Sequence, residues 1–97
     1  MATIHMSRRH RLNPVDARER VAKVAETLKL KFGADYRWED DCLHLKRAGA
    51  DGTIDISKAG MVTVNVRLGL ALRPMKTVIE NSILKGFDQV LEPDEAT

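Results

Sequence analysis

The sequence predicts an α+β fold in which two helices pack on an antiparallel sheet of four to five strands, in the order β-α-β-β-β-β-α. Apolar and polar residues alternate at the strand period of two through much of the stretch from Tyr36 to Leu68, which indicates an antiparallel meander. A second alternating stretch from Thr3 to Ser7 predicts one more strand beside it. Two further stretches have apolar residues at helical spacing, and each has a proline near its start.

The last strand of the meander, from Met61 to Leu68, has the clearest alternation and therefore one buried and one wetter face. The apolar positions expected to face the core are Val62, Val64, Val66 and Leu68. The two strands before it repeat the pattern around Ile54 and Leu43, and a short strand from Tyr36 to Trp38 precedes them.

Turns are expected at three places between these strands. Glu39-Asp40-Asp41 breaks the pattern and is expected to fold the short strand back on the next one. Asp51-Gly52 suits a turn that needs positive φ, and Lys58-Ala59-Gly60 places glycine where a three-residue hairpin loop needs a left-handed residue.

The first helix has a strong start signal, because Asn13 suits the N-cap, Pro14 the first helical position and Asp16 the positive first turn. Gly33 is expected to end the helix. The stripe expected to face the sheet is Ala17, Val21, Val24, Leu28 and Phe32.

The second helix is expected from Pro74 to Leu91. Its apolar stripe consists of Met75, Ile79, Ile83, Gly86, Phe87 and Val90. Val78, Leu84 and Leu91 widen this face beyond what one sheet covers easily, so they form the candidate apolar interaction surface. Glycine inside a helix costs about 1 kcal/mol against alanine, so we expect Gly86 to lie close to the sheet backbone.

Length and composition indicate one soluble globular domain over residues 1–91, with a disordered acidic tail at 92–97. The 97 residues are 43% hydrophobic and 31% charged, and no apolar run reaches the roughly 18 residues of a membrane span. The net charge of +2 is too small to indicate a nucleic acid. A single cysteine and no secretory signal favour a cytoplasmic location.

The sequence contains no motif that indicates catalysis, a cofactor or a metal. Cys42 and His44 share a strand face, but two ligands do not make a zinc site and no others follow at a suitable spacing. Glu39, Asp40 and Asp41 are expected in a solvated turn, where an acid/base pair is unfavourable. No nucleophile elbow and no glycine-rich phosphate loop is present.

One basic cluster is a candidate anion contact. It consists of Arg8, Arg9, His10 and Arg18, the last of these one turn into the first helix. A solvated loop that keeps the protein soluble is the favoured interpretation of this cluster. Trp38 is expected to fill the edge of the core.

The element order is similar to the TATA-binding-protein-like and helix-grip folds, in which a long carboxy-terminal helix crosses a curved sheet. A closer resemblance, to the small putative polyhydroxyalkanoic acid system proteins, extends from about Thr3 to Leu91. It rests on the order and spacing of Ile4, His10, Leu12, Ala17-Arg18, Phe32-Gly33, Tyr36-Arg37-Trp38, Leu43, Gly49, Asp51-Gly52, Leu68-Gly69, Lys76 and Ile79. The sequence departs from that pattern at Asn13-Pro14 and in the acidic turn at 39–41.

This resemblance implies a non-enzymatic bacterial accessory protein of polyhydroxyalkanoate storage, which contacts the polyester granule surface, a granule-associated protein or a second copy of itself. It implies no catalytic residues and no cofactor. The alternative is a small hydrophobic ligand-binding module that holds an acyl group in the groove between the sheet and the carboxy-terminal helix. A cavity beneath Ile79, Ile83 and Phe87 would favour the ligand module, whereas a filled core would favour an interaction protein.

Overall fold

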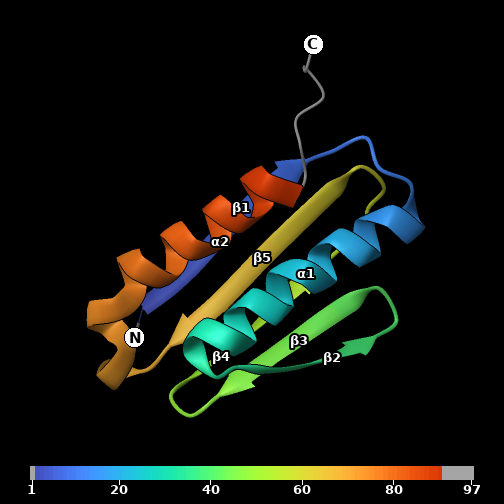
Figure 1. The fold of residues 1–97 in the computed structure, drawn as a ribbon. Helices are drawn as coiled ribbons and strands as arrows, with labels where there is room; N and C mark the ends of the chain where they lie inside the picture. Colours follow the sequence, from blue (N-terminus) through green and yellow to red (C-terminus); the bar gives the residue numbers. More distant parts are fainter. Residues whose placement is uncertain (1, 91–97) are drawn as a thin grey trace.

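A computed structural model of the chain describes residues 2–90. The elements in chain order are β1 (Ala2–Arg9), α1 (Pro14–Phe32), β2 (Asp35–Glu39), β3 (Cys42–Arg47), β4 (Ala50–Asp55), β5 (Met61–Leu68), the 3-10 helix η1 (Leu70–Met75) and α2 (Lys76–Val90). The strands form one antiparallel sheet in the order β1-β5-β4-β3-β2. The predicted α+β class and element order are therefore confirmed (Figure 1).

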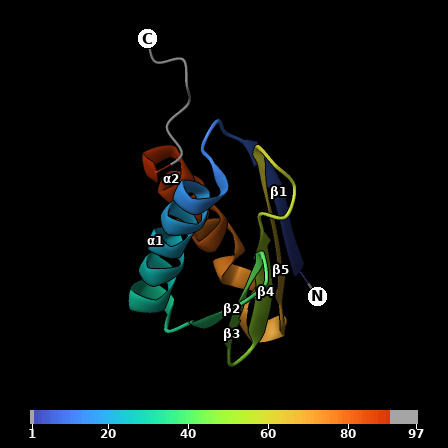
Figure 2. The ribbon, with the colours of Figure 1, turned by 90° about the vertical axis from the view of Figure 1, so that its right-hand side faces the viewer.

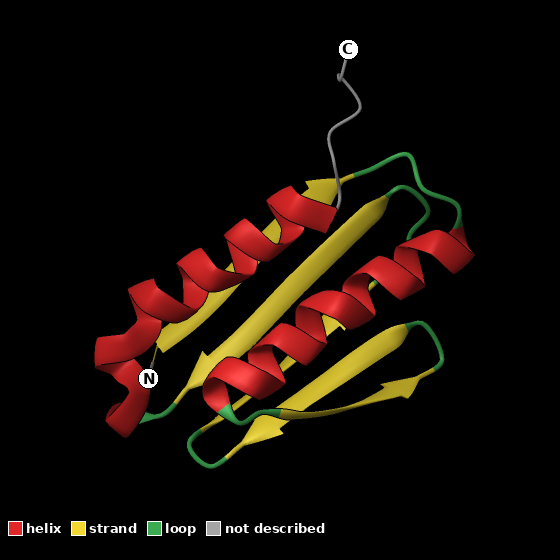
Figure 3. Cartoon of the chain, in the orientation of Figure 1, coloured by secondary structure: helices red, strands yellow, loops and turns green. Residues whose placement is uncertain are grey.

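The molecule has two layers, because both helices lie on the same face of the sheet. In Figure 1, α2 lies over β1 and α1 lies beside it over the other half of the sheet. Figure 2 shows the two helices on one side and the bare second face of the sheet on the other. The same division is visible in Figure 3, where the strands form a single layer behind the helices. One whole sheet face is thus left without a covering element among the described residues.

The ends of α1 follow the predicted capping chemistry. The Asn13 side chain accepts a hydrogen bond of 2.8 Å from the Asp16 backbone N–H, which satisfies one of the free donors at the helix start. Gly33 has a φ of 73° and its N–H donates to the Lys29 carbonyl at 2.9 Å, as in a left-handed helix end. Between these two caps, the helix buries Ala17, Val21, Val24, Ala25 and Leu28 in the core.

Two of the three predicted turns are confirmed and one is wrong. Gly60 has a φ of 76°, and the turn between β2 and β3 has Asp40 at a φ of 56°. Gly52, however, lies inside β4, where it pairs with Leu45 and Val66. Gly49 makes the turn instead, with a φ of 86°. The physical reason for glycine at 52 is space, because a Cβ there would lie 2.8 Å from the Asn65 carbonyl oxygen.

The second helix begins differently from the prediction. The Leu72 N–H donates to the Gly69 carbonyl at 3.0 Å and starts the 3-10 helix η1, so Pro74 lies within that turn and α2 begins at Lys76. The expected approach of Gly86 to the sheet is also wrong. A Cβ at Gly86 would meet the Val24 side chain at 3.4 Å, so this glycine brings α2 close to α1. Leu91 and the expected tail lie outside the described residues.

The core lies between the helices and the sheet. The largest fully buried side chains in it are Phe87, Ile4, Leu43, Ile54, Leu68, Ile83, Val21, Val24, Val62 and Val64. Among the described residues, no polar or charged residue is buried with them. The apolar side of each predicted strand faces this core. The polar side of each strand therefore faces away from the helices.

Candidate interaction site on the open face of the sheet

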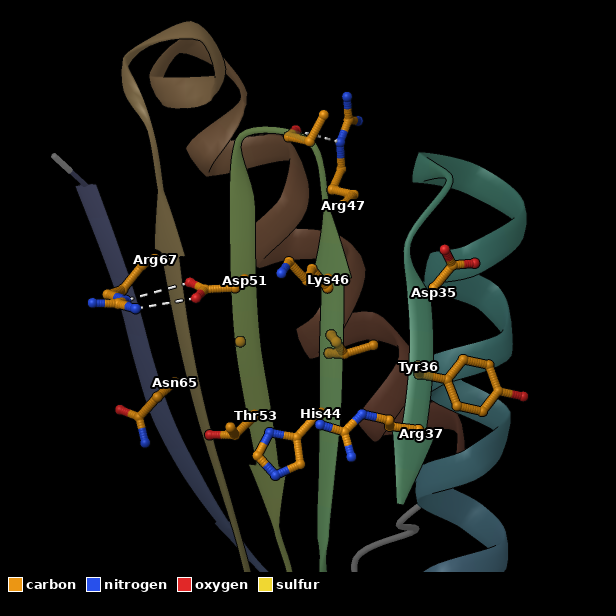
Figure 4. Close-up of a pocket in the computed structure, with 13 residues that line it drawn as sticks. Asp35, Tyr36, Arg37, His44, Lys46, Arg47, Asp51, Thr53, Asn65 and Arg67 are labelled. Carbon is orange, nitrogen blue, oxygen red and sulfur yellow. Dashed lines mark hydrogen bonds and ion pairs between the residues drawn. The ribbon is translucent and has the colours of Figure 1, made fainter. Parts of the chain in front are cut away.

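The uncovered sheet face carries polar side chains in three rows that run across all five strands. The strand register gives the rows as Thr3-Arg67-Asp51-Lys46-Asp35, His5-Asn65-Thr53-His44-Arg37 and Ser7-Thr63-Asp55-Cys42-Glu39. The face is hollowed over about 680 Å³, and residues of the first two rows contribute much of the lining of this hollow (Figure 4). We call this hollow the sheet-face hollow.

The first row has charges of alternating sign. Arg67 donates to both carboxylate oxygens of Asp51, from Nη2 at 3.0 Å and from Nε at 3.3 Å, as the dashed lines in Figure 4 show. This bidentate pair raises the pKa of Arg67. Lys46 and Asp35 continue the row toward β2. Cross-strand pairs of opposite charge stabilise a sheet, so the row supports the strand order as well as forming the surface.

The second row consists of groups that donate and accept hydrogen bonds. His5 Nδ1 lies within hydrogen-bond distance of Asn65 Oδ1 at the β1 end of the row. At the other end, His44 Nε2 lies 3.1 Å from a Glu39 oxygen, and Arg37 Nη1 lies 3.2 Å from the second oxygen. The hydrogen bond and charge of Arg37, together with the His44 charge, lower the pKa of Glu39. The carboxylate therefore holds both basic side chains at the β2 edge of the face.

The third row contains Cys42 and Asp55, whose pKa values move in opposite directions. Burial raises the pKa of the Cys42 thiol, and the neighbouring Asp55 and Glu39 carboxylates raise it further. Hydrogen bonds from the Ser57 side chain and backbone N–H lower the pKa of Asp55. A thiol that stays protonated is a poor metal ligand. Within residues 2–90, no three histidine, cysteine or acidic side chains are arranged to hold a metal ion.

The four residues of the candidate anion contact are not gathered at one point. Arg8 lies on the helix side of β1 and pairs with Asp88 of α2. Arg9 is exposed, and the His10 ring accepts a hydrogen bond of 3.1 Å from the Leu12 N–H. Burial lowers the pKa of His10. Binding of an anion by this cluster stays a prediction.

Arg18, the fourth residue of that cluster, lies at the opposite edge of the sheet. Its guanidinium is 4.1 Å from the centre of the Trp38 ring and donates to the Asp40 carbonyl at 3.0 Å. Trp38 itself is half-buried and packs against the core, so the stacked arginine covers its outer side. Next to it, the Tyr36 hydroxyl donates to Glu26 of α1 at 2.7 Å, which raises the pKa of Tyr36. These contacts tie β2 to α1.

The candidate apolar surface is divided between two flanks of α2. Val78 is 53% exposed, whereas Leu84 is half-buried. The two residues are six positions apart, which places them about 120° apart around a helix with 3.6 residues per turn. Leu84 lies one turn before Asp88, which pairs with Arg8, so it belongs to the flank that faces β1. Leu91 lies outside the described residues.

The space between the sheet and the helices is small. A hollow of about 50 Å³ lies there, lined by apolar residues that include Leu45, Ile79 and Ile83. This is far below the roughly 300 Å³ at which small-molecule pockets begin. Ile83 and Phe87 are almost completely buried, so their side chains fill the place where a ligand groove was predicted from the sequence.

The alternation of the strands predicted a polar face, but not the rows across it or the hollow. Those depend on the order of the strands in the sheet, which the alternation within each strand does not specify. Asp51, which was predicted to lie in a turn, lies opposite Arg67 on this face, and the charged or polar residues at alternate positions of 51–55 and 63–67 are the signal that could have indicated it. No helix within residues 2–90 has the length and hydrophobicity needed to cross a membrane.

The fold and this surface define a small two-layer α+β protein that leaves a polar sheet face uncovered by the other described residues. The sequence profile of the family described as "Putative polyhydroxyalkanoic acid system protein" matches residues 4–91, and the chain belongs to this family. No curated protein and no solved structure matches the chain.

Proposed function

We propose that this protein is a non-enzymatic accessory protein of polyhydroxyalkanoate storage that binds another protein at the granule surface through the open face of its sheet. Family membership supports the process, since the family description names the polyhydroxyalkanoic acid system. The location that follows from the proposal is the cytoplasm at the surface of storage granules. The open polar face with its hollow of about 680 Å³ supports the mode of action.

The chemistry of this face suits a protein better than bare polyester. Among the residues whose side chains the structure describes, the large apolar side chains that are most exposed are Val15, Leu30, Leu70 and Val78, and all of them lie in helices and none in the sheet. An aliphatic polyester offers ester carbonyls but no charge, so it would displace water from the charged rows without providing charged groups in return. A protein surface with both signs of charge can match them, and such complementarity provides specificity in protein complexes.

Co-sedimentation with granules tests the proposal. Native granules that keep their protein coat should sediment the protein, and granules stripped of protein should retain several-fold less. Lys46→Glu reverses an exposed charge that lines the sheet-face hollow and should weaken this binding several-fold. Lys85→Glu makes the same change on the exposed side of α2 and should bind as the unaltered protein does.

Two results would contradict the proposal. Stronger binding to stripped granules would indicate direct contact with the polymer, through the helices and their exposed apolar residues such as Val78. An equal loss of binding in Lys46→Glu and Lys85→Glu would show that the sheet face has no special part in it.

The acyl-binding module is the second candidate function, because the hollow of about 50 Å³ is lined by Ile79 and Ile83, two of the residues beneath which the groove was predicted. An acyl chain would enter only if α2 moved away from the sheet. Titration with medium-chain 3-hydroxy acids, followed by the thermal midpoint, tests this function: a saturable rise would support it.

A further inference from the structure

The two edge strands of the sheet differ in how well they are protected against pairing with a strand of another molecule. The sheet order leaves β1 at one edge and β2 at the other. Exposed edges present unpaired backbone N–H and C=O groups and tend to pair with other strands, unless charges, bulges or covering elements prevent it. β2 has five residues, of which Asp35, Arg37 and Glu39 are charged. Stacking of Arg18 on Trp38 covers it further.

β1 lacks this protection. It has eight residues, and its charges lie only at the end, at Arg8 and Arg9. The segment from Ala2 to Ser7 contains no charge and no proline. All eight residues pair with β5 in one unbroken register, so no bulge turns the edge away.

The register shows which backbone groups of β1 face outward. The His10 N–H donates to the Gly60 carbonyl at 3.0 Å, in continuation of the β1 and β5 register. In an antiparallel ladder the bonding direction alternates, so even-numbered residues of β1 bond to β5. The N–H and C=O groups of Thr3, His5, Ser7 and Arg9 therefore point to the free edge.

The same reasoning applied to β2 gives a shorter edge. The Ile56 N–H donates to the Asp41 carbonyl at 2.9 Å, in continuation of the β3 and β4 register. It follows that even-numbered residues of β3 bond to β2, and that only Tyr36 and Trp38 of β2 point their backbone groups outward. β1 thus offers twice as many unpaired positions as β2.

We propose that the β1 edge pairs antiparallel with the β1 edge of a second copy, so that the two five-stranded sheets join into one. Two registers, centred on His5 or on Met6, set the outward backbone groups of the two copies opposite each other. In the register centred on Met6, Arg8 and Arg9 of one copy lie opposite Ile4 and Thr3 of the other, and in the register centred on His5, Arg8 lies opposite Ala2. A parallel pairing in register would instead set these arginines side by side, so the placement of charge favours the twofold antiparallel arrangement.

The α2 flank above this edge adds apolar surface to the seam. Met6 on the helix side of β1 is half-buried, as is Leu84 on the flank of α2 that faces β1. The ion pair of Arg8 with Asp88 holds α2 over the strand. Two copies joined at β1 would bring Met6 of both β1 strands and Leu84 of both α2 helices toward the shared seam. There these side chains would be buried more deeply than in the single chain.

Ser7 provides a matched pair of variants. Its N–H points to the free edge, so Ser7→Pro removes a donor that the single chain does not use, while proline is tolerated on edge strands in this orientation. Ser7→Ala removes the same hydroxyl, which lies 3.5 Å from the Thr63 hydroxyl, but keeps the N–H. Sedimentation velocity over a concentration series should show dimers for the unaltered protein and Ser7→Ala, and a dimer dissociation constant at least ten-fold higher for Ser7→Pro. Any purification tag belongs at the carboxyl end, away from β1.

Backbone amide exchange of the unaltered protein gives a test that needs no variant. The outward amides of His5 and Ser7 should exchange more slowly at high than at low protein concentration, whereas the corresponding amides of Tyr36 and Trp38 should not change. A protein that stays monomeric at all concentrations would overturn the proposal. Equal dimerisation of Ser7→Pro and Ser7→Ala, or capture of β1 only by a strand of another protein, would overturn it as well.

Discussion

Gly86 of α2 faces Val24 of α1, and a Cβ at position 86 would lie 3.4 Å from Val24 Cγ2. The two helices therefore approach each other where α2 has no side chain and α1 has a small branched one. This contact sets how closely the two helices lie beside each other on the covered face of the sheet (Figure 2).

Substitutions at Gly86 should separate two opposing effects on stability, the gain in helix propensity and the overpacking against Val24. Gly86→Ala gains up to about 1 kcal/mol of helix propensity, and its Cβ meets Val24 at an ordinary contact distance, so we expect unchanged or higher stability. Gly86→Leu should overpack against Val24 and lower the free energy of unfolding by about 1–3 kcal/mol. Urea denaturation measures both. A midpoint for Gly86→Leu equal to or above that of the unaltered protein would show that the helices separate freely.

Gly52→Ala should be destabilising although φ at this position is not in the left-handed region. The new Cβ would lie 2.8 Å from the Asn65 carbonyl oxygen and 2.9 Å from Val66 Cγ2, so β4 and β5 must move apart. We expect a loss of about 1–3 kcal/mol. Thr53→Ala is the control, because Thr53 follows Gly52 in β4 but lies on the open face. This variant should lower the free energy of unfolding by less. Similar losses in the two variants would contradict a steric role for Gly52.

Local features of the fold could be predicted from the sequence, whereas features that depend on distant parts of the chain could not. Local chemistry predicted the caps at Asn13 and Gly33, since a cap depends on residues within one turn. The Asp51-Gly52 pair has turn chemistry too, yet the chain needs glycine there because β5 lies close. Such reasons depend on partners that are distant in sequence. The polar rows and the free β1 edge follow from strand order in the same way, so alternation alone did not predict them.

Asp55 should contribute to the pH dependence of stability. Hydrogen bonds from Ser57 lower the pKa of Asp55 in the folded protein below the value near 3.9 of an unfolded chain. The stabilisation is therefore fully present above the unfolded pKa and is lost as the pH falls through the lower, folded pKa. Asp55→Asn can keep the hydrogen bond of 2.7 Å from the Ser57 N–H but does not titrate. Urea midpoints at pH 7 and pH 3 should differ less in Asp55→Asn than in the unaltered protein; equal differences would contradict the assignment.

Cys42 and His44 should bind no metal. The pKa of the Cys42 thiol is raised by burial and by nearby carboxylates, and zinc requires the thiolate and further ligands. Protein purified without added metal should contain less than a tenth of an equivalent of zinc by elemental analysis, and a chelator should not change its thermal midpoint. Stoichiometric zinc that is lost together with stability in Cys42→Ser would show that a site has been overlooked.

Leu84→Glu should affect association of the protein more than its folding. Leu84 is half-buried on the flank of α2 that faces β1, so a carboxylate there would meet the second copy at the proposed seam and be desolvated without a partner. We expect at least a ten-fold weaker dimer and only a modest fall in the thermal midpoint.

Gln89→Glu is the matched control for Leu84→Glu, because it adds the same charge at an exposed position about 140° around α2 from Leu84, away from the flank that faces β1, and should leave the dimer unchanged. Sedimentation velocity and thermal denaturation of both variants separate the possible outcomes. If Leu84 packed mainly within the single chain, its variant would unfold or lose many degrees of stability, since an unpaired buried carboxylate is costly. A folded Leu84→Glu protein that dimerises and binds granules as the unaltered protein does would show that this flank of α2 is ordinary surface, and would restrict the seam to the backbone of β1.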